Sequence, residues 1–234
     1  MYKQTLKIVI AMMTLMFSCQ SKAIAISSLF EVADLNTHLA DIQVINNDGK
    51  DMFINLEMSK VRYIDGKKVE EKLNKDNVGD WTFRVSPSQM ILKPGERKTI
   101  RMLNDCDEDC EFSEDQVYAV SVTPVPYSEG RKSAVAVAFG YKVYFIDPAS
   151  EVRIDYDLKR ISKDKISFEN RSNTMLNAVL NLCTKNFNSD CIYEYRLLPN
   201  SKREFKLPLK SQEQSTLKFS VINANEVVHE RVTL

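Results

Sequence analysis

The chain has 234 residues, of which 44% are hydrophobic and 27% charged, and its 32 basic side chains balance its 32 acidic ones. This balance argues against a nucleic-acid-binding protein, which needs a concentrated basic face. The length is sufficient for two modest domains, each able to bury its own core.

The first residues have the pattern of a secretory signal peptide. Lys3 and Lys7 precede an apolar run over residues 8–17, and residues 23–25 (Ala-Ile-Ala) supply a small-x-small cleavage motif. The apolar run is too short to anchor the chain in a membrane, and no later segment could span one. We therefore predict that residues 1–25 are removed on export. The three leader lysines leave with them, so the mature chain keeps 29 basic and 32 acidic side chains and a net charge of −3.

The cysteines also point to an exported protein. Cys19 raises the alternative of a lipoprotein, but the Phe and Ser before it make a poor context for lipid attachment. Cleavage leaves an even number of cysteines, which suggests two disulfides. Sequence spacing favours the pairs Cys106–Cys110 and Cys183–Cys191. Zinc binding by four thiolates is the less favoured alternative, because the pairs lie in different halves of the chain and lack finger spacing.

The mature chain reads as short strands separated by turns, with hardly any helix. Many short alternating runs with regular turn signals are typical of a β-sandwich. The first series occupies residues 41–45, 52–58, 81–85, 98–103, 117–122 and 134–145, and the second occupies residues 152–156, 166–169, 178–182, 192–198, 205–207, 217–222 and 227–232. The two series meet near Pro148, which cannot donate a ladder hydrogen bond. We therefore predict an all-β protein with two sandwich domains, 26–148 and 149–234.

The last strand of the first series has two different faces, because successive side chains in a strand point in opposite directions. One face is small and ends in a cation: Ala136, Ala138, Gly140 and Lys142. The other face is a row of large apolar side chains: Val135, Val137, Phe139 and Tyr141. Such a row on an unpaired strand suits pairing with another protein. The alternative is an ordinary sandwich strand that is buried on both faces.

The order of these signals resembles a known family. Residues 85–101 contain Ser86-Pro87, an apolar stretch, the turn Pro94-Gly95 and a strand that ends at Arg101. Further along come residues 118–126 before the two-faced strand, and then, in the second half, residues 182–183, Cys191, 197–201 and 221–223. In this order, and after a signal peptide, the chain resembles the periplasmic pilus chaperones of the chaperone–usher pathway, and most closely their alternate, or α, class. The resemblance covers essentially the whole mature chain.

The resemblance implies a fold and a function. It implies two immunoglobulin-like β-sandwich domains in an L-shaped arrangement. It also implies a periplasmic chaperone that binds pilus subunits by donating a β-strand and delivers them to an outer-membrane usher. No nucleotide, other cofactor or metal is expected, and neither is stable membrane insertion. The free protein is expected to cap its donor strand by self-association.

The resemblance also assigns residues to the subunit-binding site. The inserted side chains would be Val135, Val137 and Phe139, with Tyr141 at the end of the row, and Lys142 would anchor the terminal carboxylate of the subunit. Members of the family use a second basic residue on the first strand. Residues 26–48 contain no lysine or arginine, and His38 is wrongly placed for that role. Either another residue, with Lys60 and Arg62 as the candidates, supplies the second anchor, or the carboxylate is held in a different way.

Three further expectations from the resemblance concern structure. The Ser86–Pro87 bond lies where relatives have a cis peptide. Arg101 is expected to bridge Glu114 and a second-domain position that is filled here by Asn223 or Asn225, which would fix the angle between the domains. Cys183–Cys191 matches a disulfide of the α class, whereas Cys106–Cys110 has no counterpart and would stiffen a loop.

Other functions have less support in the sequence. The chain has two histidines, His38 and His229, and no phosphate-binding glycine loop, so no enzyme is indicated. The acidic residues within 105–109 are expected to be a solvated loop tip, with a weak calcium site as the alternative. A structural fimbrial subunit or adhesin would need an alternating apolar arm after cleavage, which residues 26–35 lack. A carbohydrate-binding sandwich would need exposed aromatic side chains, and Trp81 is the only tryptophan.

Overall fold

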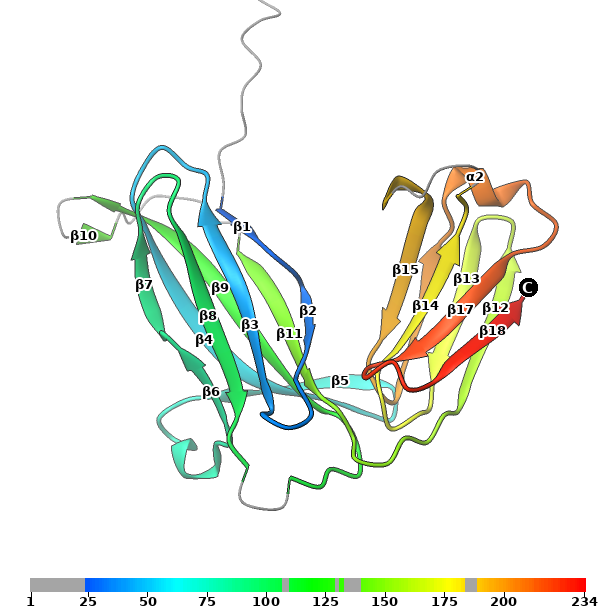
Figure 1. Cartoon of the computed structure of the whole chain (residues 1–234), viewed down its shortest axis with the longest axis horizontal. Helices are drawn as coiled ribbons and strands as arrows, with labels where there is room; N and C mark the ends of the chain where they lie inside the picture. Colours follow the sequence, from blue (N-terminus) through cyan, green and yellow to red (C-terminus); the bar gives the residue numbers. More distant parts are fainter. Residues whose placement is uncertain (1–23, 107–109, 129–130, 133–139, 184–188) are drawn as a thin grey trace, which may run out of the picture.

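The computed structural model describes residues 24–106, 110–128, 131–132, 140–183 and 189–234. They form two β-sandwich domains, the first coloured blue to green and the second yellow to red (Figure 1). The domains meet at one end, where β5 (Lys67–Leu73) lies, and diverge towards the other end. The all-β, two-sandwich fold predicted from the sequence is confirmed. Among the described residues, no helix has the length and apolar character needed to span a bilayer.

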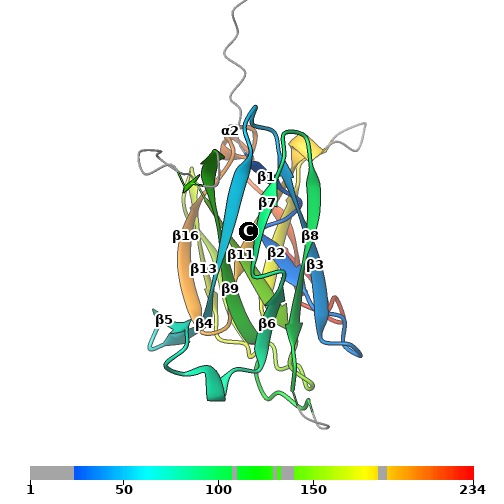
Figure 2. The same ribbon diagram turned by 90° about the vertical axis from the view of Figure 1, so that its left-hand side faces the viewer.

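The first domain contains two sheets, and alternation along their strands directs one side of each sheet inward. The smaller sheet has the order β1 (Ile24–Ile26), β3 (Leu39–Asn46), β8 (Arg97–Asn104) and β6 (Phe83–Ser86). The larger sheet has the order β2 (Phe30–Val32), β11 (Tyr141–Asp147), β9 (Gln116–Ser128), β4 (Met52–Ile64) and β5, with β7 (Gln89–Leu92) paired to β4 and β10 (Arg131–Lys132) paired to β9. The two sheets pack face to face (Figure 2).

Large apolar side chains fill the space between these sheets. Phe83 of β6 stacks on Tyr118 of β9 with the ring centroids 4.3 Å apart, and Phe145 of β11 lies 5.0 Å from the Phe83 ring. Val143 and Phe145 are fully buried in this core. The inward face of β11 is therefore Tyr141, Val143 and Phe145, and the alternate residues face outward.

The first strand changes sheets. Residues Ile24–Ile26 pair antiparallel with β3 in the smaller sheet, and residues Phe30–Val32 pair parallel with Tyr144–Ile146 of β11 in the larger one. Ile24 is buried in the core, and its carbonyl oxygen accepts a hydrogen bond from the Tyr141 hydroxyl at 3.0 Å. β1 thus begins two residues before the predicted start of the first domain.

The second domain is a smaller sandwich. One sheet contains β12 (Tyr156–Ser162), β13 (Lys165–Asn170) and β16 (Ser201–Lys206), and the other contains β15 (Ile192–Leu197), β14 (Leu176–Asn181), β17 (Lys218–Asn223) and β18 (His229–Thr233). One short helix, α2 (Leu209–Gln212), and two 3-10 turns, Val78–Asp80 and Ser189–Cys191, complete the described elements.

One predicted strand is wrong: residues 152–155 are not in a sheet, and β12 begins at Tyr156. Instead, this stretch bonds to a loop. The backbone N–H of Arg153 donates to Asn173 Oδ1, and that of Asp155 donates to Ser172 Oγ. The alternating apolar pattern was misleading here, because side-chain acceptors on a turn take the place of a neighbouring strand.

The two predicted disulfides and the expected cis peptide bond are present. Cys106 is bonded to Cys110, and Cys183 is bonded to Cys191. The Ser86–Pro87 peptide bond is cis.

The expected network of Arg101, Glu114 and Asn223 is not formed, and this prediction is corrected. Arg101 lies directly opposite Asp41 on β3 and donates to both of its carboxylate oxygens, at 3.0 and 3.1 Å. This pair belongs to the smaller sheet, away from the second domain. Asn223 instead donates to Asn225 Oδ1 within its own domain. Glu114 does link the domains, because it accepts a hydrogen bond of 2.6 Å from Asn200.

Candidate functional site

The candidate site lies on the outer face of the larger sheet, at the side of the first domain that faces the second. Ile146 and Tyr144 of β11 belong to an apolar cluster shared between the domains. Lys142 has the same parity in the strand as these two residues, so its side chain extends from the same face. The rise of about 3.3 Å per residue puts Lys142 roughly 7 Å along the strand from Tyr144. Lys142 thus marks the edge of the interdomain surface.

The interdomain cluster and one buried carboxylate fix this surface. The cluster joins side chains of β4, β9 and β11 to three residues of the second domain: Met175, Leu198 and Ala224. Asp115 is buried and accepts the backbone N–H groups of Ala149 and Met175, at 2.9 and 2.6 Å. Burial raises the pKa of Asp115 to about 6, although these hydrogen bonds act in the opposite direction. One side chain of the first domain therefore holds two backbone positions of the second.

Lys142 is part of a compact charged cluster on this face. Its Nζ lies 2.6 Å from Oε1 of Glu70, and Nζ of Lys68 lies 2.9 Å from Oε2 of the same carboxylate. The Ser59 hydroxyl donates to Glu70 Oε1 at 2.8 Å. Burial alone would raise the pKa of Glu70, but the hydrogen bonds from Lys142, Lys68 and Ser59 outweigh it and lower this pKa to about 2. The cluster therefore keeps an ionised carboxylate between two ammonium groups.

The two candidates for a second anchor lie elsewhere. Ser59 of β4 faces Glu70, so Lys60 and Arg62, which have the opposite parity in that strand, extend from its other face. Lys60 Nζ lies 5.8 Å from the centroid of the Tyr118 ring, and Arg62 pairs with Glu71 at 3.4 Å. The structure brings Lys68, and neither Lys60 nor Arg62, next to Lys142.

The backbone of β11 is only partly covered. On one side it pairs with β9 along its whole length. On the other side β2 pairs with it from Tyr144 onward, so within the described residues Tyr141–Val143 have no strand partner on that side. The Tyr144 N–H donates to Leu29 on the β2 side, so the N–H and C=O of Lys142, two residues earlier, face the same, uncovered side. Unpaired backbone groups at a strand edge are a template for another strand.

Of the four predicted donor side chains, Tyr141 is within the described residues. Val135, Val137 and Phe139 lie outside the described residues. Tyr141 packs against the core of its own domain, and its hydroxyl is engaged by Ile24. Gly140 precedes it at a tight approach, because a Cβ built on Gly140 would lie 2.6 Å from the carbonyl oxygen of Val122.

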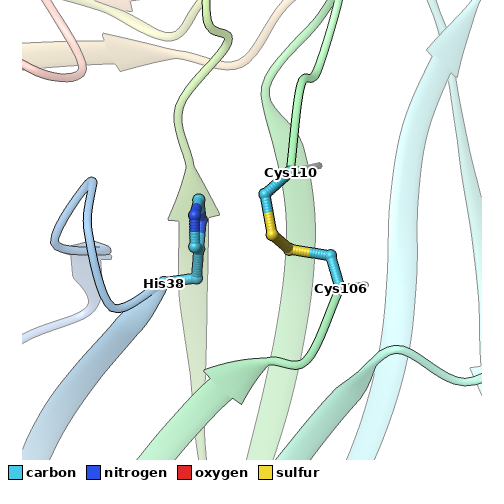
Figure 3. A group of neighbouring side chains, drawn as sticks. All are labelled: His38, Cys106 and Cys110. Carbon is cyan, nitrogen blue, oxygen red and sulfur yellow. A yellow bond between two sulfur atoms is a disulfide. The ribbon is translucent and has the colours of Figure 1, made fainter. Parts of the chain in front are cut away.

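His38, Cys106 and Cys110 lie close together, and their role is structural. Figure 3 shows His38 facing the Cys106–Cys110 disulfide, with their potential ligand atoms within 4.8 Å of one another. The sulfur atoms are bonded to each other, so neither is a thiolate that could bind a metal. His38 Nδ1 lies 2.9 Å from the fully buried carboxylate of Asp147, which also accepts a hydrogen bond from Asn104. His38 thus holds the end of β11 and is not an anchor.

The sequence reasoning missed β5 and therefore Glu70 and Lys68. A signal was present: β4 and β5 are joined by Asp65-Gly66, both with positive φ, at 51° and 70°. Asp-Gly between two strand-like runs is a strong hairpin signal. The run after it was overlooked because it is almost entirely charged.

Comparison with known proteins defines the class of fold. The solved structure of the class 5 fimbriae chaperone CfaA is 16% identical, matches 90% of this chain and 97% of that one, and has a TM-score of 0.52. A chain from the complex of the Salmonella enterica SafA pilin with the SafB chaperone is 12% identical, matches 93% of this chain and 99% of that one, and has a TM-score of 0.53. The fold is therefore that of the fimbrial chaperones of the chaperone–usher pathway.

The family can be stated more closely. The sequence model described as CS5 fimbrial protein N-terminal domain matches residues 26–148, more than half of the chain, and the chain belongs to this family. An Escherichia coli protein described as an uncharacterized 25.9 kDa protein in CS5 3'region is 22% identical over 136 residues. That match covers 57% of this chain and 59% of the relative, so the chain spans less than two thirds of the length of this curated relative.

Proposed function

We propose that the protein is a periplasmic chaperone that binds fimbrial subunits by strand pairing along β11 and delivers them to an outer-membrane usher. The observation that carries this proposal is the uncovered edge of β11 at Tyr141–Val143. The middle residue of this stretch, Lys142, extends its side chain from the interdomain face. The fold supports it, since the structures that share it include a chaperone in complex with a pilin. Export by removal of the leader and a location in the periplasm are part of the same proposal.

The free energy of subunit capture would come from side chains on both sides of Gly140 in the sequence. Val135, Val137 and Phe139 would enter an apolar groove of the subunit, and full burial of one such side chain contributes about 1.5–3 kcal/mol. Lys142 would hold the terminal carboxylate of the subunit through a charge-assisted hydrogen bond, worth about 1.5–3 kcal/mol. The backbone hydrogen bonds mainly fix the register, because water satisfies these groups in the free protein. The proposed reaction is protein binding and not catalysis, and it needs no cofactor.

The second candidate function is a structural subunit or adhesin of a fimbrial fibre. The description of its family as a CS5 fimbrial protein favours this candidate, because those words fit a fibre component as well as a chaperone. The two functions differ in location. A chaperone stays in the periplasm, whereas a fibre component is recovered from the cell surface with sheared fimbriae.

The test is co-purification with a subunit encoded beside this protein. Val137→Asp and Lys142→Ala should each abolish subunit capture while the protein remains folded. Lys98→Ala is the matched control: its side chain is 40% exposed against 39% for Lys142, and it also pairs with a glutamate, but it lies on the smaller sheet. Retained capture by either site variant, or equal loss in the control, would contradict the site. Recovery of the protein in sheared fimbriae would favour the second candidate.

A further inference from the structure

The ammonium group proposed to anchor a subunit already binds a carboxylate within its own chain. Lys142, Lys68 and Ser59 place three donors within 2.9 Å of the Glu70 oxygens. The donors come from three different strands: β11, β5 and β4. Cations and hydroxyls that converge on one carboxylate form a carboxylate-binding site, whichever carboxylate fills it.

Glu70 lies on the edge strand of the larger sheet. It lies on β5, which is the last strand in the order of the larger sheet and pairs with β4 alone among the described strands. The Glu70 side chain is 28% exposed and that of Lys142 is 39% exposed, so solvent and a second carboxylate can reach both. With two cations and one anion, the cluster keeps a net positive charge that attracts another carboxylate.

We propose that Glu70 is an internal stand-in for the terminal carboxylate of a subunit: it fills the site in the free protein, and the subunit displaces it to bind Lys142 and Lys68. This inference rests on the proposed function, and it identifies Lys68 as the second cation that residues 26–48 do not supply. Lys68 is held over β11 independently of Glu70. Its Nζ donates to the Tyr144 hydroxyl at 3.0 Å and lies 5.3 Å from the centroid of that ring. The Lys68 ammonium therefore keeps a partner when Glu70 leaves, and the Lys142 ammonium is released to bind another carboxylate.

The need to displace Glu70 lowers the apparent affinity for a subunit. The apparent dissociation constant is the intrinsic constant divided by the fraction of protein in which the site is open. A site that is open in about one tenth of the molecules loses about tenfold in affinity. An isolated carboxylate would then compete poorly, whereas a subunit that also pairs with β11 can supply the free energy of displacement.

The test measures how one subunit partitions between two chaperone variants. The probe is the subunit that co-purifies with the wild-type protein, mixed with differently tagged wild-type protein and Glu70→Gln. Glu70→Gln should bind the subunit about tenfold more tightly, because the competing charge is gone. Glu71→Gln is the matched control: Glu71 adjoins Glu70 on β5 but pairs with Arg62 on the other face. It should leave the partition unchanged.

Two further arms test the chemistry of the site. A subunit extended by a few residues at its C-terminus moves the carboxylate away, so the gain from Glu70→Gln should disappear. Adding Lys68→Ala to Glu70→Gln should also remove the gain, because the second cation is lost. Trp81 fluorescence establishes that each variant is folded, and Glu70→Ala provides a second variant if Glu70→Gln is not.

The outcomes separate this inference from the proposed function. If the wild-type protein captures no subunit, the proposed function fails and the inference fails with it. If capture occurs but folded Glu70→Gln binds the subunit equally or more weakly, Glu70 is a structural support and only the inference is overturned. A gain that persists with the extended subunit would equally overturn it, since the carboxylate would not be the ligand.

Discussion

The buried pair of His38 and Asp147 should be one of the most sensitive points in the first domain. Asp147 is fully buried at the end of β11, and Nδ1 of His38 approaches its two oxygens at 2.9 and 3.0 Å. After His38→Ala, the Asn104 amide still donates a hydrogen bond to that carboxylate. Loss of a hydrogen-bond partner from a buried polar group costs about 1–3 kcal/mol. We expect about 3 kcal/mol, the upper end of this range, because Asp147 is fully buried.

A second substitution isolates the hydrogen bond from the backbone effect. His38 has a φ of 52°, a left-handed conformation that asparagine tolerates better than most residues. His38→Asn keeps a short side-chain N–H in this conformation, so it should retain much of the stability that His38→Ala loses. Asp147→Asn in the His38→Ala background should restore part of the loss, because an amide with a missing donor costs less to bury than a carboxyl group.

The assay is denaturant unfolding followed by tryptophan fluorescence. Trp81 is the only tryptophan and lies in the first domain, so its signal reports that domain alone. In thermal unfolding followed by the same fluorescence, a loss of about 3 kcal/mol should lower the melting temperature by about 10 °C in a domain of this size. A loss below about 1 kcal/mol for His38→Ala would refute the reasoning, and so would a double variant no more stable than His38→Ala.

Two further predictions concern the candidate site. Gly140→Ala would place a Cβ 2.6 Å from the Val122 carbonyl oxygen, so β11 must shift away from β9 at a cost of about 1–3 kcal/mol. Subunit capture should weaken, whereas Gly79→Ala, which meets nothing within 4 Å, serves as the control; equal effects would contradict this account. Because the pKa of Glu70 is lowered from 4.5 to about 2, its ion pairs stabilise the protein above pH 4.5, and this stability is lost as the pH falls towards 2. The stability difference between wild type and Glu70→Gln should therefore shrink between pH 4.5 and 3, and a constant difference would refute it.

The sequence was sufficient for the architecture because apolar alternation encodes it directly. In β3 and β13 every second residue is buried, as are Ile100, Met102 and Asn104 of β8, and these strands lie where the alternation predicted them. β5 failed this test because six of its seven residues are exposed and no apolar stripe marks it. Only its turn residues, Asp65 and Gly66, carried the information.

The site was harder to predict, because it depends on which face of a strand meets another strand. Lys142 could be singled out from its position in the strand, but its partner Glu70 is 72 residues away in sequence. The role of Arg101 was wrong for the same reason: its neighbour across the sheet is Asp41, and only the pairing of β3 with β8 decides this. Long-range register is absent from any local pattern.

The parallel pairing of β2 with β11 limits how far another strand can pair along the same edge. It covers β11 from Tyr144 onward, so a strand that docks along the free edge can extend only as far as Val143. In the proposed complex, the terminal residue of that strand would then lie beside Lys142, whatever the length of chain before it. Under the proposed function, the three residues of β2 would set where a docked strand ends, and deleting them should let that strand pair further along β11.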